Sequence, residues 1–452
     1  FFCFFFDDVI SRSRFLHFSF QRKKEGIGLS IDDAPIKKMP SSSTTRFLLL
    51  DGGMGHLLKR QGNATSFLGG ALASEPATIK EAHRKFIEAG AADLTTATFG
   101  VTPVSLKRAG IPDSELEGIT RRVARLAVEV AAEENAKRQE EAGGGKGGKG
   151  KRVLVAGCLP PLGQNCYLPR CCSPSSERSI NEAAAVYERI AGALLEAGVD
   201  LFLAEACSGS GDAEAAVRGA TRAAANSSRS PSPASRSFPL WLSFTVDDEQ
   251  PLRLRGGEEL EAAARRALSQ KEKGRLPVSA LLLNCSSPGA VSKALPVLLK
   301  VISEQQEGEE IGIGCYANGF RRTTTSWLRA EGVALPPPTP SSPSNAAAAE
   351  EEEEEADYGY DGEEGMITPG CYARYARRWV RSFRCGSGSG GGSGSCGGSG
   401  SCGGSGSGGG SKTEKSCRSS PPRPPSFFVL GGCCGVGPEH IRALRDLLDA
   451  ED

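Results

Sequence analysis

The stretch SINEAAAVYERIAGALLEAGVDLFLAEAC, residues 179–207, contains one complete helix-to-strand unit. Apolar residues recur at spacings of three and four up to Gly198, which predicts an amphipathic helix with Asn181 as a candidate N-cap and Gly198 as its end. The apolar run 199–207 follows directly and is expected to be a buried strand. A helix that leads straight into an apolar strand is typical of repeated βα units around a parallel sheet.

The same alternation is repeated along the whole chain. Strands are expected at 47–53, 92–99, 152–159, 199–207, 238–246, 278–285, 310–318 and 427–434. Helices are expected at 75–90, 113–141, 180–198, 257–273, 289–304, 369–383 and 437–449. Because eight parallel strands, each followed by a helix, close into a barrel, the sequence predicts an α/β protein with a (β/α)8 TIM barrel.

Low-complexity segments interrupt this pattern and are expected to be disordered loop insertions. They lie near 143–151, 226–237, 333–365 and 385–426. The acidic segment 336–365 follows the seventh expected strand and so emerges on the active-site face, whereas the other three join a helix to the next strand. Residues 46–452 are expected to form the barrel domain. Residues 1–45 are expected to be a presequence or an unstructured, over-extended N-terminus, since the first methionine is Met39.

Composition limits the classes of partner. Lys and Arg total 54 and Asp and Glu total 54, so the formal net charge of zero gives no electrostatic reason to expect a nucleic-acid or membrane partner. No apolar stretch reaches the roughly 18–20 residues of a membrane helix. Fifteen cysteines in a chain with long apolar runs favour thiol or metal chemistry in a reduced compartment over a disulfide scaffold. We therefore expect a cytoplasmic protein, with organellar targeting and the oligomeric state left open.

Reactive side chains gather at the expected carboxyl ends of strands, where a barrel of this type builds its active site. These residues are Asp51, Glu205, Cys285, Cys433 and Cys434. Glycines flank the last two cysteines and permit a backbone turn that would aim both thiols at one point. Three thiolates with a fourth position open make a catalytic zinc site, and sulfur ligands favour zinc over magnesium, calcium or manganese.

Blander interpretations exist for each of these residues. A free cysteine is commonly a small buried hydrophobe, and we interpret Cys158, Cys207 and Cys315 in that way because they lack a glycine-flanked neighbour. Asp51 and Glu205 could instead be solvated acids or caps at strand ends. The cysteine pair together with a third thiol at another strand end favours the metal site.

Several motifs together resemble the homocysteine S-methyltransferase family, whose Hcy-binding domain is a zinc-dependent barrel. They are LLLDGGMGHLL (48–58), EAGAADLTTATF (88–99), AGCLPPLGQNCYLP (156–169), EAGVDLFLAEAC (196–207), ALLLNCSSP (280–288), ITPGCYARYARRWV (367–380) and GGCCGVGPEHI (431–441). The resemblance implies that Cys285, Cys433 and Cys434 bind zinc and that the homocysteine sulfur takes the open position. It also implies that Asp51 and Glu205 pair with the substrate ammonium.

The chain also departs from the family pattern. Ala97 stands where the family usually has Asn, so one polar contact is expected to be absent, and Ala206 stands where Thr is expected; both departures concern substrate detail more than zinc. His56 is expected to be a surface residue or to support the site, because a metal-bound thiol needs no base. Phe99 and Tyr167 are candidates to offer aromatic faces to a cationic methyl donor, with buried packing as the alternative.

The resemblance implies an enzyme of methionine biosynthesis that transfers a methyl group to homocysteine from a small donor. A sulfonium, S-methylmethionine or S-adenosylmethionine, is the expected donor, because its leaving group departs neutral and needs no acid catalyst. Two alternatives stay open: a betaine-dependent methyltransferase, and a non-catalytic barrel whose thiols sense zinc or oxidants.

Overall fold

The structure is a computed structural model that describes residues 46–61, 75–141, 152–162, 176–227, 238–269, 276–305, 310–320, 323–324, 365–386 and 425–451. These residues belong to one structural unit, Thr45–Asp452. The expected N-terminal segment 1–45, the candidate residue Tyr167 and the four expected insertions, apart from the edges of three of them, lie outside the described residues.

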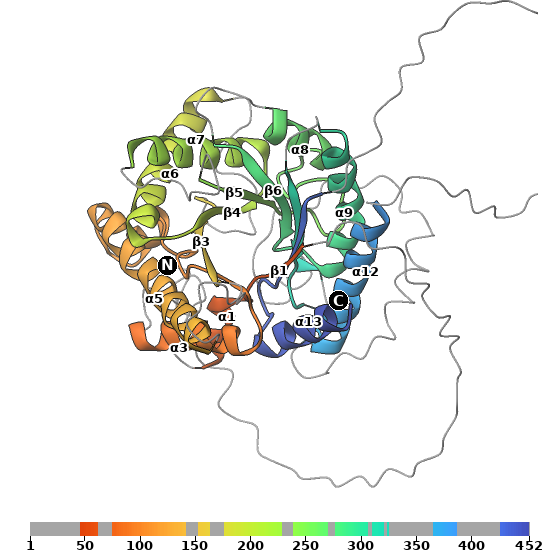
Figure 1. Ribbon diagram of the computed structural model, residues 1–452. Coiled ribbons are helices and arrows are strands. Elements are labelled where there is room, and N and C mark those ends of the chain that lie inside the picture. Colours follow the sequence, from red (N-terminus) through yellow and green to blue (C-terminus); the bar gives the residue numbers. More distant parts are fainter. Residues whose placement is uncertain are drawn as a thin grey trace, which may run out of the picture. The chain divides into compact units, whose positions relative to one another are not determined.

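Eight parallel strands form one sheet that curls into a nearly closed barrel (Figure 1). The strands are β1 Arg46–Leu49, β2 Asp93–Thr95, β3 Leu154–Leu159, β4 Leu201–Cys207, β5 Leu240–Phe244, β6 Val278–Asn284, β7 Gly312–Tyr316 and β8 Phe427–Leu430. Their order around the sheet is β1-β8-β7-β6-β5-β4-β3-β2. Each overlaps an expected strand, so the predicted (β/α)8 TIM-like barrel is confirmed.

The seam between the first two strands is bridged partly by a side chain. The backbone N–H of Ala92 donates to Leu49 O at 2.8 Å. Slightly further along, the N–H of Thr95 donates to Oδ2 of Asp51 at 2.9 Å. The carboxylate of Asp51 therefore ties the end of β1 to the end of β2, which fixes its own position at the mouth of the barrel.

Helices surround the strands on the outside (Figure 1). They are α1 Met54–Arg60, α3 Pro76–Glu88, α4 Pro103–Arg108, α5 Leu116–Glu141, α6 Glu177–Ala197, α7 Ser210–Asn226, α8 Leu260–Ser269, α9 Pro288–Ser303, α12 Pro369–Gly386 and α13 Pro438–Glu451, with a short 3-10 turn at Asp113–Glu115. All seven expected helices are present. Among the described helices, none is long and apolar enough to cross a membrane.

Helix α7 was missed by the sequence prediction, and its packing explains why. Its buried face consists mostly of alanine, glycine and serine rather than of large apolar residues. At Gly219 a Cβ atom would lie 2.4 Å from Cβ of Tyr187 on α6, so only glycine permits this approach of the two helices. A face of small residues gives a weak hydrophobic period in the sequence although it is fully buried in the structure.

The start of α6 corrects the expected cap. The N-cap is Ser176, whose Oγ accepts a hydrogen bond from Ser179 N at 3.3 Å, and Asn181 lies inside the helix. There the side chain of Asn181 donates to Glu177 Oε1 at 3.0 Å instead. The prediction was wrong because the first helical turn is polar, so the apolar period begins after it. The expected end at Gly198 is confirmed by its left-handed φ of 104°.

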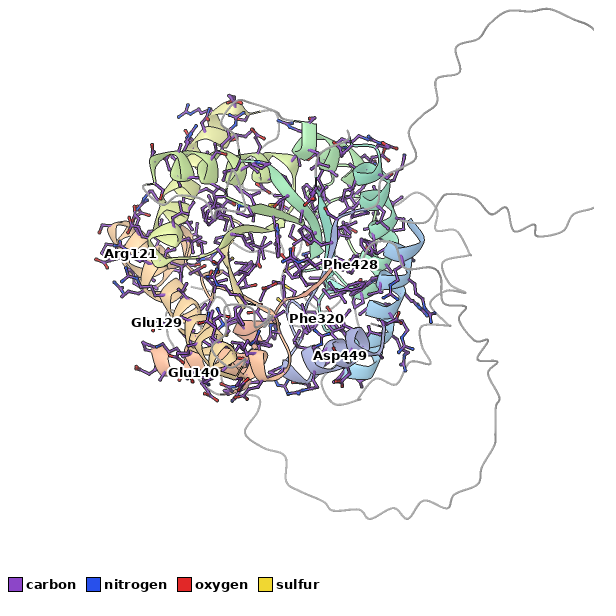
Figure 2. The ribbon with its side chains drawn as sticks, viewed as in Figure 1. Arg121, Glu129, Glu140, Phe320, Phe428 and Asp449 are labelled. Carbon is purple, nitrogen blue, oxygen red and sulfur yellow. The ribbon has the colours of Figure 1, made fainter. Side chains whose placement is uncertain are left out.

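Apolar side chains fill both the barrel interior and the layer between strands and helices (Figure 2). The interior group consists of Leu48, Leu50, Ala156, Leu201, Leu203, Trp241, Ala280, Leu282, Tyr316 and Val429. The larger outer group, which includes Phe428, joins the sheet to the helices. Because the interior is packed along its length, space for a ligand is left only at an end of the barrel.

Candidate active site

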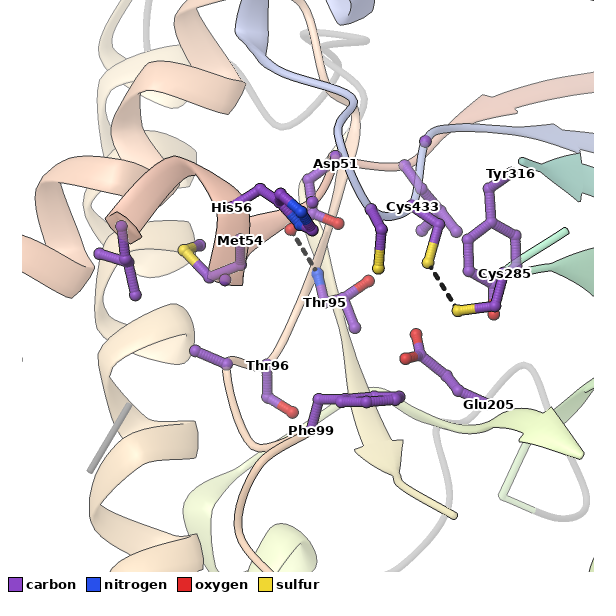
Figure 3. Close-up of a pocket in the computed structure, with 18 of the residues that line it drawn as sticks. Asp51, Met54, His56, Thr95, Thr96, Phe99, Glu205, Cys285, Tyr316 and Cys433 are labelled. Atoms are coloured by element: carbon purple, nitrogen blue, oxygen red, sulfur yellow. Dashed lines mark hydrogen bonds between the residues drawn. The ribbon is translucent and has the colours of Figure 1, made fainter. Parts of the chain in front are cut away.

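A cavity of about 110 Å³ lies at the carboxyl ends of the strands (Figure 3). All five residues singled out at the strand ends line it: Asp51, Glu205, Cys285, Cys433 and Cys434. The remaining lining residues are Leu50, Gly52, Gly53, Met54, Gly55, His56, Leu58, Thr95, Thr96, Ala97, Phe99, Gly100, Tyr316 and Gly432. The fold thus brings thiol and carboxyl groups from four strands to one pocket.

The three thiols surround a common point. The Sγ atoms of Cys285 and Cys433 are 3.0 Å apart, and all three Sγ atoms, including that of Cys434, lie within 4.8 Å of one another. Sulfurs at about 2.3 Å from a tetrahedral zinc ion are about 3.8 Å apart. The described residues therefore supply three soft donors at a spacing that fits one zinc ion after small adjustments.

Backbone turns aim these thiols. Cys285 follows β6 with a left-handed φ of 51°, which is uncommon for a residue with a side chain. Cys433 and Cys434 follow β8 in a turn that is closed by the hydrogen bond from Val436 N to Cys433 O at 3.0 Å. Gly435 in this turn has a φ of 82°, a conformation that glycine adopts without strain. This is the turn that the flanking glycines predicted.

The thiols strongly influence one another's protonation. Hydrogen bonds with Cys433 and Cys434, followed by burial, raise the pKa of the Cys285 thiol well above its ordinary value. Hydrogen bonds from Cys285 and Cys433 lower the pKa of Cys434, and a hydrogen bond from His56 acts in the same direction. One thiolate is thus stabilised by its two neighbours, and a divalent cation at the centre would take over the role of the shared protons.

Two buried carboxyl groups face the same cavity. Asp51 is 4% exposed and Glu205 is 8% exposed. Burial raises the pKa of Asp51 to about 7. Burial, with the neighbouring charge of Asp51 as the next cause, raises the pKa of Glu205 to about 8. Both carboxylates are therefore poorly stabilised without a ligand, and a cationic group that entered the cavity would stabilise them.

Cys158 contacts the acidic side of the site. Its Sγ donates to Glu205 Oε2 at 3.6 Å. Its backbone N–H donates to Oγ1 of Thr96, which lines the cavity, at 2.9 Å. The interpretation of Cys158 as packing alone was therefore incomplete, whereas Cys207 and Cys315 lie in the outer hydrophobic core as expected.

Asn284, which sequence reasoning missed, lies beside the thiols. Its Oδ1 accepts hydrogen bonds from Ser243 Oγ at 2.7 Å and from Ala206 N at 3.1 Å. These two donors fix the amide so that Nδ2 faces the sulfurs, 3.5 Å from Cys285 Sγ and 4.0 Å from Cys433 Sγ. In a regular strand, neighbouring side chains point to opposite faces, so the dipeptide Asn-Cys gave no signal that both side chains serve one site.

Two further residues considered in the sequence analysis, His56 and Phe99, both lie at the cavity. His56 lines the cavity, and its ring centroid lies 5.7 Å from that of Phe320, so it belongs to the site rather than to the open surface. Phe99 also lines the cavity. Ala97 lies there without a polar group. Ala206, directly after Glu205, has a left-handed φ of 52°, similar to that of Cys285. The backbone therefore bends both beside the carboxyl group of Glu205 and at the thiol of Cys285.

Comparison with known proteins identifies the family. The family model described as Homocysteine S-methyltransferase matches residues 48–448, a range that includes all five site residues. The metallated form of the homocysteine methyltransferase MmuM from Escherichia coli is 18% identical, with 88% of this chain and 96% of that chain covered and a TM-score of 0.52. The oxidized form of MmuM is 19% identical, with 90% of this chain and 96% of that chain covered and a TM-score of 0.53. Both MmuM structures therefore share the fold of this chain. The chain is an enzyme that belongs to the homocysteine S-methyltransferase family.

Proposed function

We propose that the protein transfers a methyl group from a small sulfonium donor to homocysteine, with zinc bound by Cys285, Cys433 and Cys434, and so forms methionine. The observation that carries the proposal is the meeting of three thiols and two buried carboxyl groups in one cavity of a chain from this family. Neither group alone would define the substrate, because the thiols favour a metal and the carboxyl groups favour a cation.

The thiol side of the cavity suits a catalytic metal rather than a structural one. Three protein sulfurs leave one of four tetrahedral positions for a substrate atom. A bound zinc ion would supply Lewis-acid activation that deprotonates the homocysteine thiol at neutral pH. Asn284 would hold the sulfurs of Cys285 and Cys433 through its amide.

The acidic side suits the other end of homocysteine. Asp51 and Glu205 would accept the substrate ammonium, and this charge pairing would offset the cost of burying two carboxylates. Cys158 and Thr95 orient these carboxyl groups through the hydrogen bonds described above. The substrate would then be held at both ends, with its sulfur beside the cysteines.

The donor follows from the charge of the reaction. The homocysteine sulfur forms a bond to the methyl carbon while the methyl–sulfur bond of the donor breaks, and the electron pair leaves with the donor sulfur. That sulfur departs as a neutral thioether, so no residue has to protonate it. Phe99 lines the cavity and would offer its ring face to the sulfonium charge. We infer that S-methylmethionine is preferred, S-adenosylmethionine is second and betaine is poor.

The setting of the site supports two further parts of the proposal. No disulfide joins the cysteines whose side chains the structure describes, and thiols that bind a metal persist in a reducing compartment, so we infer that the enzyme works in the cytoplasm or in a comparably reducing organelle. The family match from 48 to 448 supports a single homocysteine-binding domain over 46–452, with the insertions as loops of that domain.

The metal is tested by its content and coordination in purified protein. We expect about one zinc per chain with three sulfur ligands, and a fourth sulfur when homocysteine is added, by X-ray absorption spectroscopy. Cys433→Ser should lose zinc and turnover together, whereas Cys371→Ala, a change at a buried cysteine of α12, should keep both. Full activity of the Cys433→Ser variant would contradict the mechanism.

The donor is tested by competition. S-methylmethionine, S-adenosylmethionine and betaine would be offered with homocysteine to the zinc-loaded enzyme, and methionine formation would be measured as kcat/KM for each donor. The highest value for betaine would overturn the sulfonium assignment and leave the metal chemistry intact. Zinc and homocysteine binding without turnover of any donor would support a sensing barrel instead.

A further inference from the structure

Cys285 holds a strained backbone conformation beside a buried ion pair. Its φ of 51° lies in the left-handed region, which a residue with a Cβ atom adopts only when its surroundings impose it. The direction of its Sγ depends on this conformation, because a return to the extended region would rotate the Cα–Cβ bond away from Cys433. What imposes the conformation is therefore relevant to metal binding.

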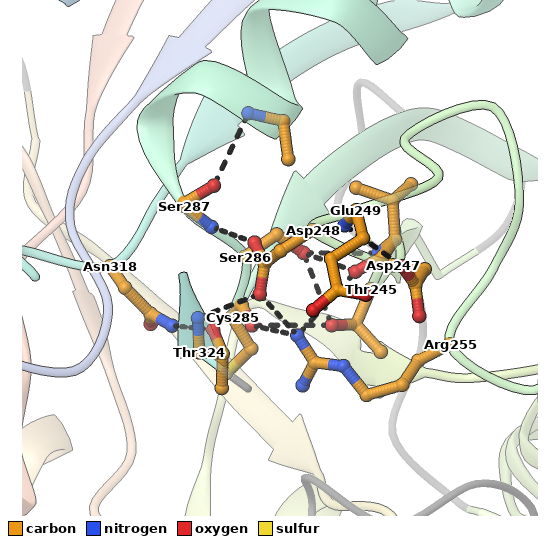
Figure 4. Close-up of polar contacts among 12 residues, drawn as sticks. Thr245, Asp247, Asp248, Glu249, Arg255, Cys285, Ser286, Ser287, Asn318 and Thr324 are labelled. Carbon is orange, nitrogen blue, oxygen red and sulfur yellow. Dashed lines mark hydrogen bonds and ion pairs between the residues drawn. The ribbon is translucent and has the colours of Figure 1, made fainter. Parts of the chain in front are cut away.

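The carbonyl group of Cys285 is held by Arg255, in the loop that follows β5 (Figure 4). Nη2 of Arg255 donates to Cys285 O at 2.9 Å, and Oγ1 of Thr245 donates to the same oxygen at 3.3 Å. Because the carbonyl orientation sets the ψ angle of its own residue, these donors restrain Cys285 directly. The backbone of Arg255 is itself anchored, since its N–H donates to Thr245 O at 3.0 Å.

Asp248 completes this arrangement. Its Oδ2 lies 3.5 Å from Arg255 Nη2 and accepts a hydrogen bond from Thr324 N at 2.8 Å. Its Oδ1 accepts from Ser287 N at 2.5 Å, two residues after Cys285. The side chain of Asp248 is 0% exposed and that of Arg255 is 8% exposed. One buried pair thus connects the loops that follow β5, β6 and β7 at the mouth of the barrel (Figure 4).

Stability alone is a poor explanation for this pair. A buried ion pair often gives no net stabilisation over apolar side chains of similar volume, because both charges lose their hydration. Two contacts of this pair instead hold the backbone around Cys285, one at its carbonyl oxygen and one at Ser287 N, while the others hold Val246 and Thr324. Outer partners of this kind fix the geometry of metal ligands and alter metal affinity when they are removed.

We propose that Arg255 and Asp248 are positioning residues that hold Cys285 in its left-handed conformation and so assemble the three-thiol site for metal. The inference rests on the proposed function, because it assumes that Cys285 is a zinc ligand. Neither residue touches the substrate in this account. The effect on chemistry is indirect and acts through the position of one sulfur.

The test measures zinc affinity rather than turnover. The zinc dissociation constant of the full chain would be determined by competition with a chromophoric chelator, and the unfolding of zinc-free protein would be measured in parallel. Arg255→Met should weaken zinc binding by roughly tenfold to a hundredfold. The Co²⁺-substituted variant should also show a weaker thiolate-to-metal charge-transfer band than the unsubstituted chain, a change that a general loss of stability would not produce.

A matched control is available on α7. Arg218 pairs with the buried carboxylate of Glu214 at 2.6 Å, and neither residue lines the cavity. Arg218→Met should lower stability without changing zinc affinity. An equal loss of zinc affinity in both variants, or unchanged affinity in Arg255→Met, would overturn the proposal.

A milder variant covers the case in which Arg255→Met does not fold. Arg255→Lys keeps a positive charge beside Asp248 but lacks the planar guanidinium that also reaches Cys285 O, so it should fold and bind zinc more weakly than the unsubstituted chain. Unchanged affinity in this variant would contradict the inference. Failure of the unsubstituted chain to bind zinc would instead reject the proposed function, which separates the two outcomes.

Discussion

At the scale of single residues, the side-chain amide of Asn284 contacts two residues with strained backbone conformations. The described residues with a side chain and a positive φ are Ala206 and Cys285, and Asn284 contacts both of them. Its Oδ1 accepts from Ala206 N, and its Nδ2 faces the sulfur of Cys285. The amide thus connects the bend after Glu205 to the bend that carries a candidate metal ligand, which is how strained positions at a site are stabilised.

We predict that Asn284→Asp weakens zinc binding. The carboxylate keeps an acceptor for Ser243 and Ala206 but replaces the N–H donor with a negative oxygen beside the thiolates. Loss of a supporting contact of this kind costs roughly tenfold to a hundredfold in metal affinity, and kcat/KM should fall with it. The measurement is zinc competition together with steady-state kinetics.

The control for this prediction is Asn135→Asp. Asn135 uses its amide in a similar way, with Nδ2 donating to Val153 O at 3.0 Å and Oδ1 accepting from Val153 N at 2.8 Å. It lies on α5 and bonds to the residue just before β3, away from the cavity, so its substitution should affect stability and not zinc affinity. Normal zinc binding by the Asn284→Asp variant would show that the amide does not support the sulfurs.

At the scale of elements, the sequence predicted the helices and strands that are marked by a local pattern of residues. Most strands of the barrel are buried apolar runs, and all eight overlap an expected strand, although β2 has only one apolar residue; Gly198 ended α6 as expected. The alanine-rich α7 and the polar first turn of α6 lack a strong apolar period, and the prediction failed at both. The same reasoning explains the site: strand-end cysteines stand out in the sequence, whereas Arg255 reaches Cys285 only through folding.

Helix α3 contains a second element-scale feature, a buried and unpaired histidine. His83 is fully buried, and neither ring nitrogen has a hydrogen-bond partner among the described residues. Burial lowers its pKa to about 3. The folded-state pKa therefore lies below the unfolded value, so the unfolded chain takes up a proton as the pH falls below about 6.5, and stability is lost by about 1.4 kcal/mol per pH unit in that range.

We predict that His83→Leu stabilises the protein, and more so in acid. Removal of two unsatisfied ring nitrogens should raise the free energy of unfolding at every pH. Removal of the titrating group should raise it by about 2 kcal/mol more at pH 5. Urea unfolding at pH 8 and pH 5, with a chelator present to exclude metal effects, measures both parts. His440→Leu is the contrasting variant, because His440 is buried but both of its ring nitrogens have partners, so this substitution should destabilise. An equal pH dependence in His83→Leu and the unsubstituted protein would refute the argument.

At the scale of the whole molecule, the site and the largest insertion are attached to opposite ends of the barrel. The five site residues lie at or just after the carboxyl ends of strands, where the cavity lies. That insertion, residues 387–426, is rich in glycine and serine in its first part, the Gly/Ser tract, and connects the end of α12 at Gly386 to the start of β8 at Phe427. Connections from a helix to the next strand lie at the other face of a (β/α)8 barrel, which serves stability rather than catalysis. Length changes in this connection should therefore leave the chemistry unaffected.

We predict that removal of residues 387–416 leaves kcat/KM for homocysteine largely unchanged. The deletion starts at 387 because Cys385 and Gly386 belong to α12, which extends further than the sequence indicated. The deletion shortens the connection about fourfold and so reduces the entropic cost of closing this loop on folding. Because each halving of loop length contributes about 0.6 kcal/mol, the free energy of unfolding should rise by about 1 kcal/mol. Kinetics and urea unfolding of the deletion variant test both expectations. A variant that unfolds cooperatively and binds zinc but has lost turnover would show that the tract takes part in the reaction, against its position between α12 and β8.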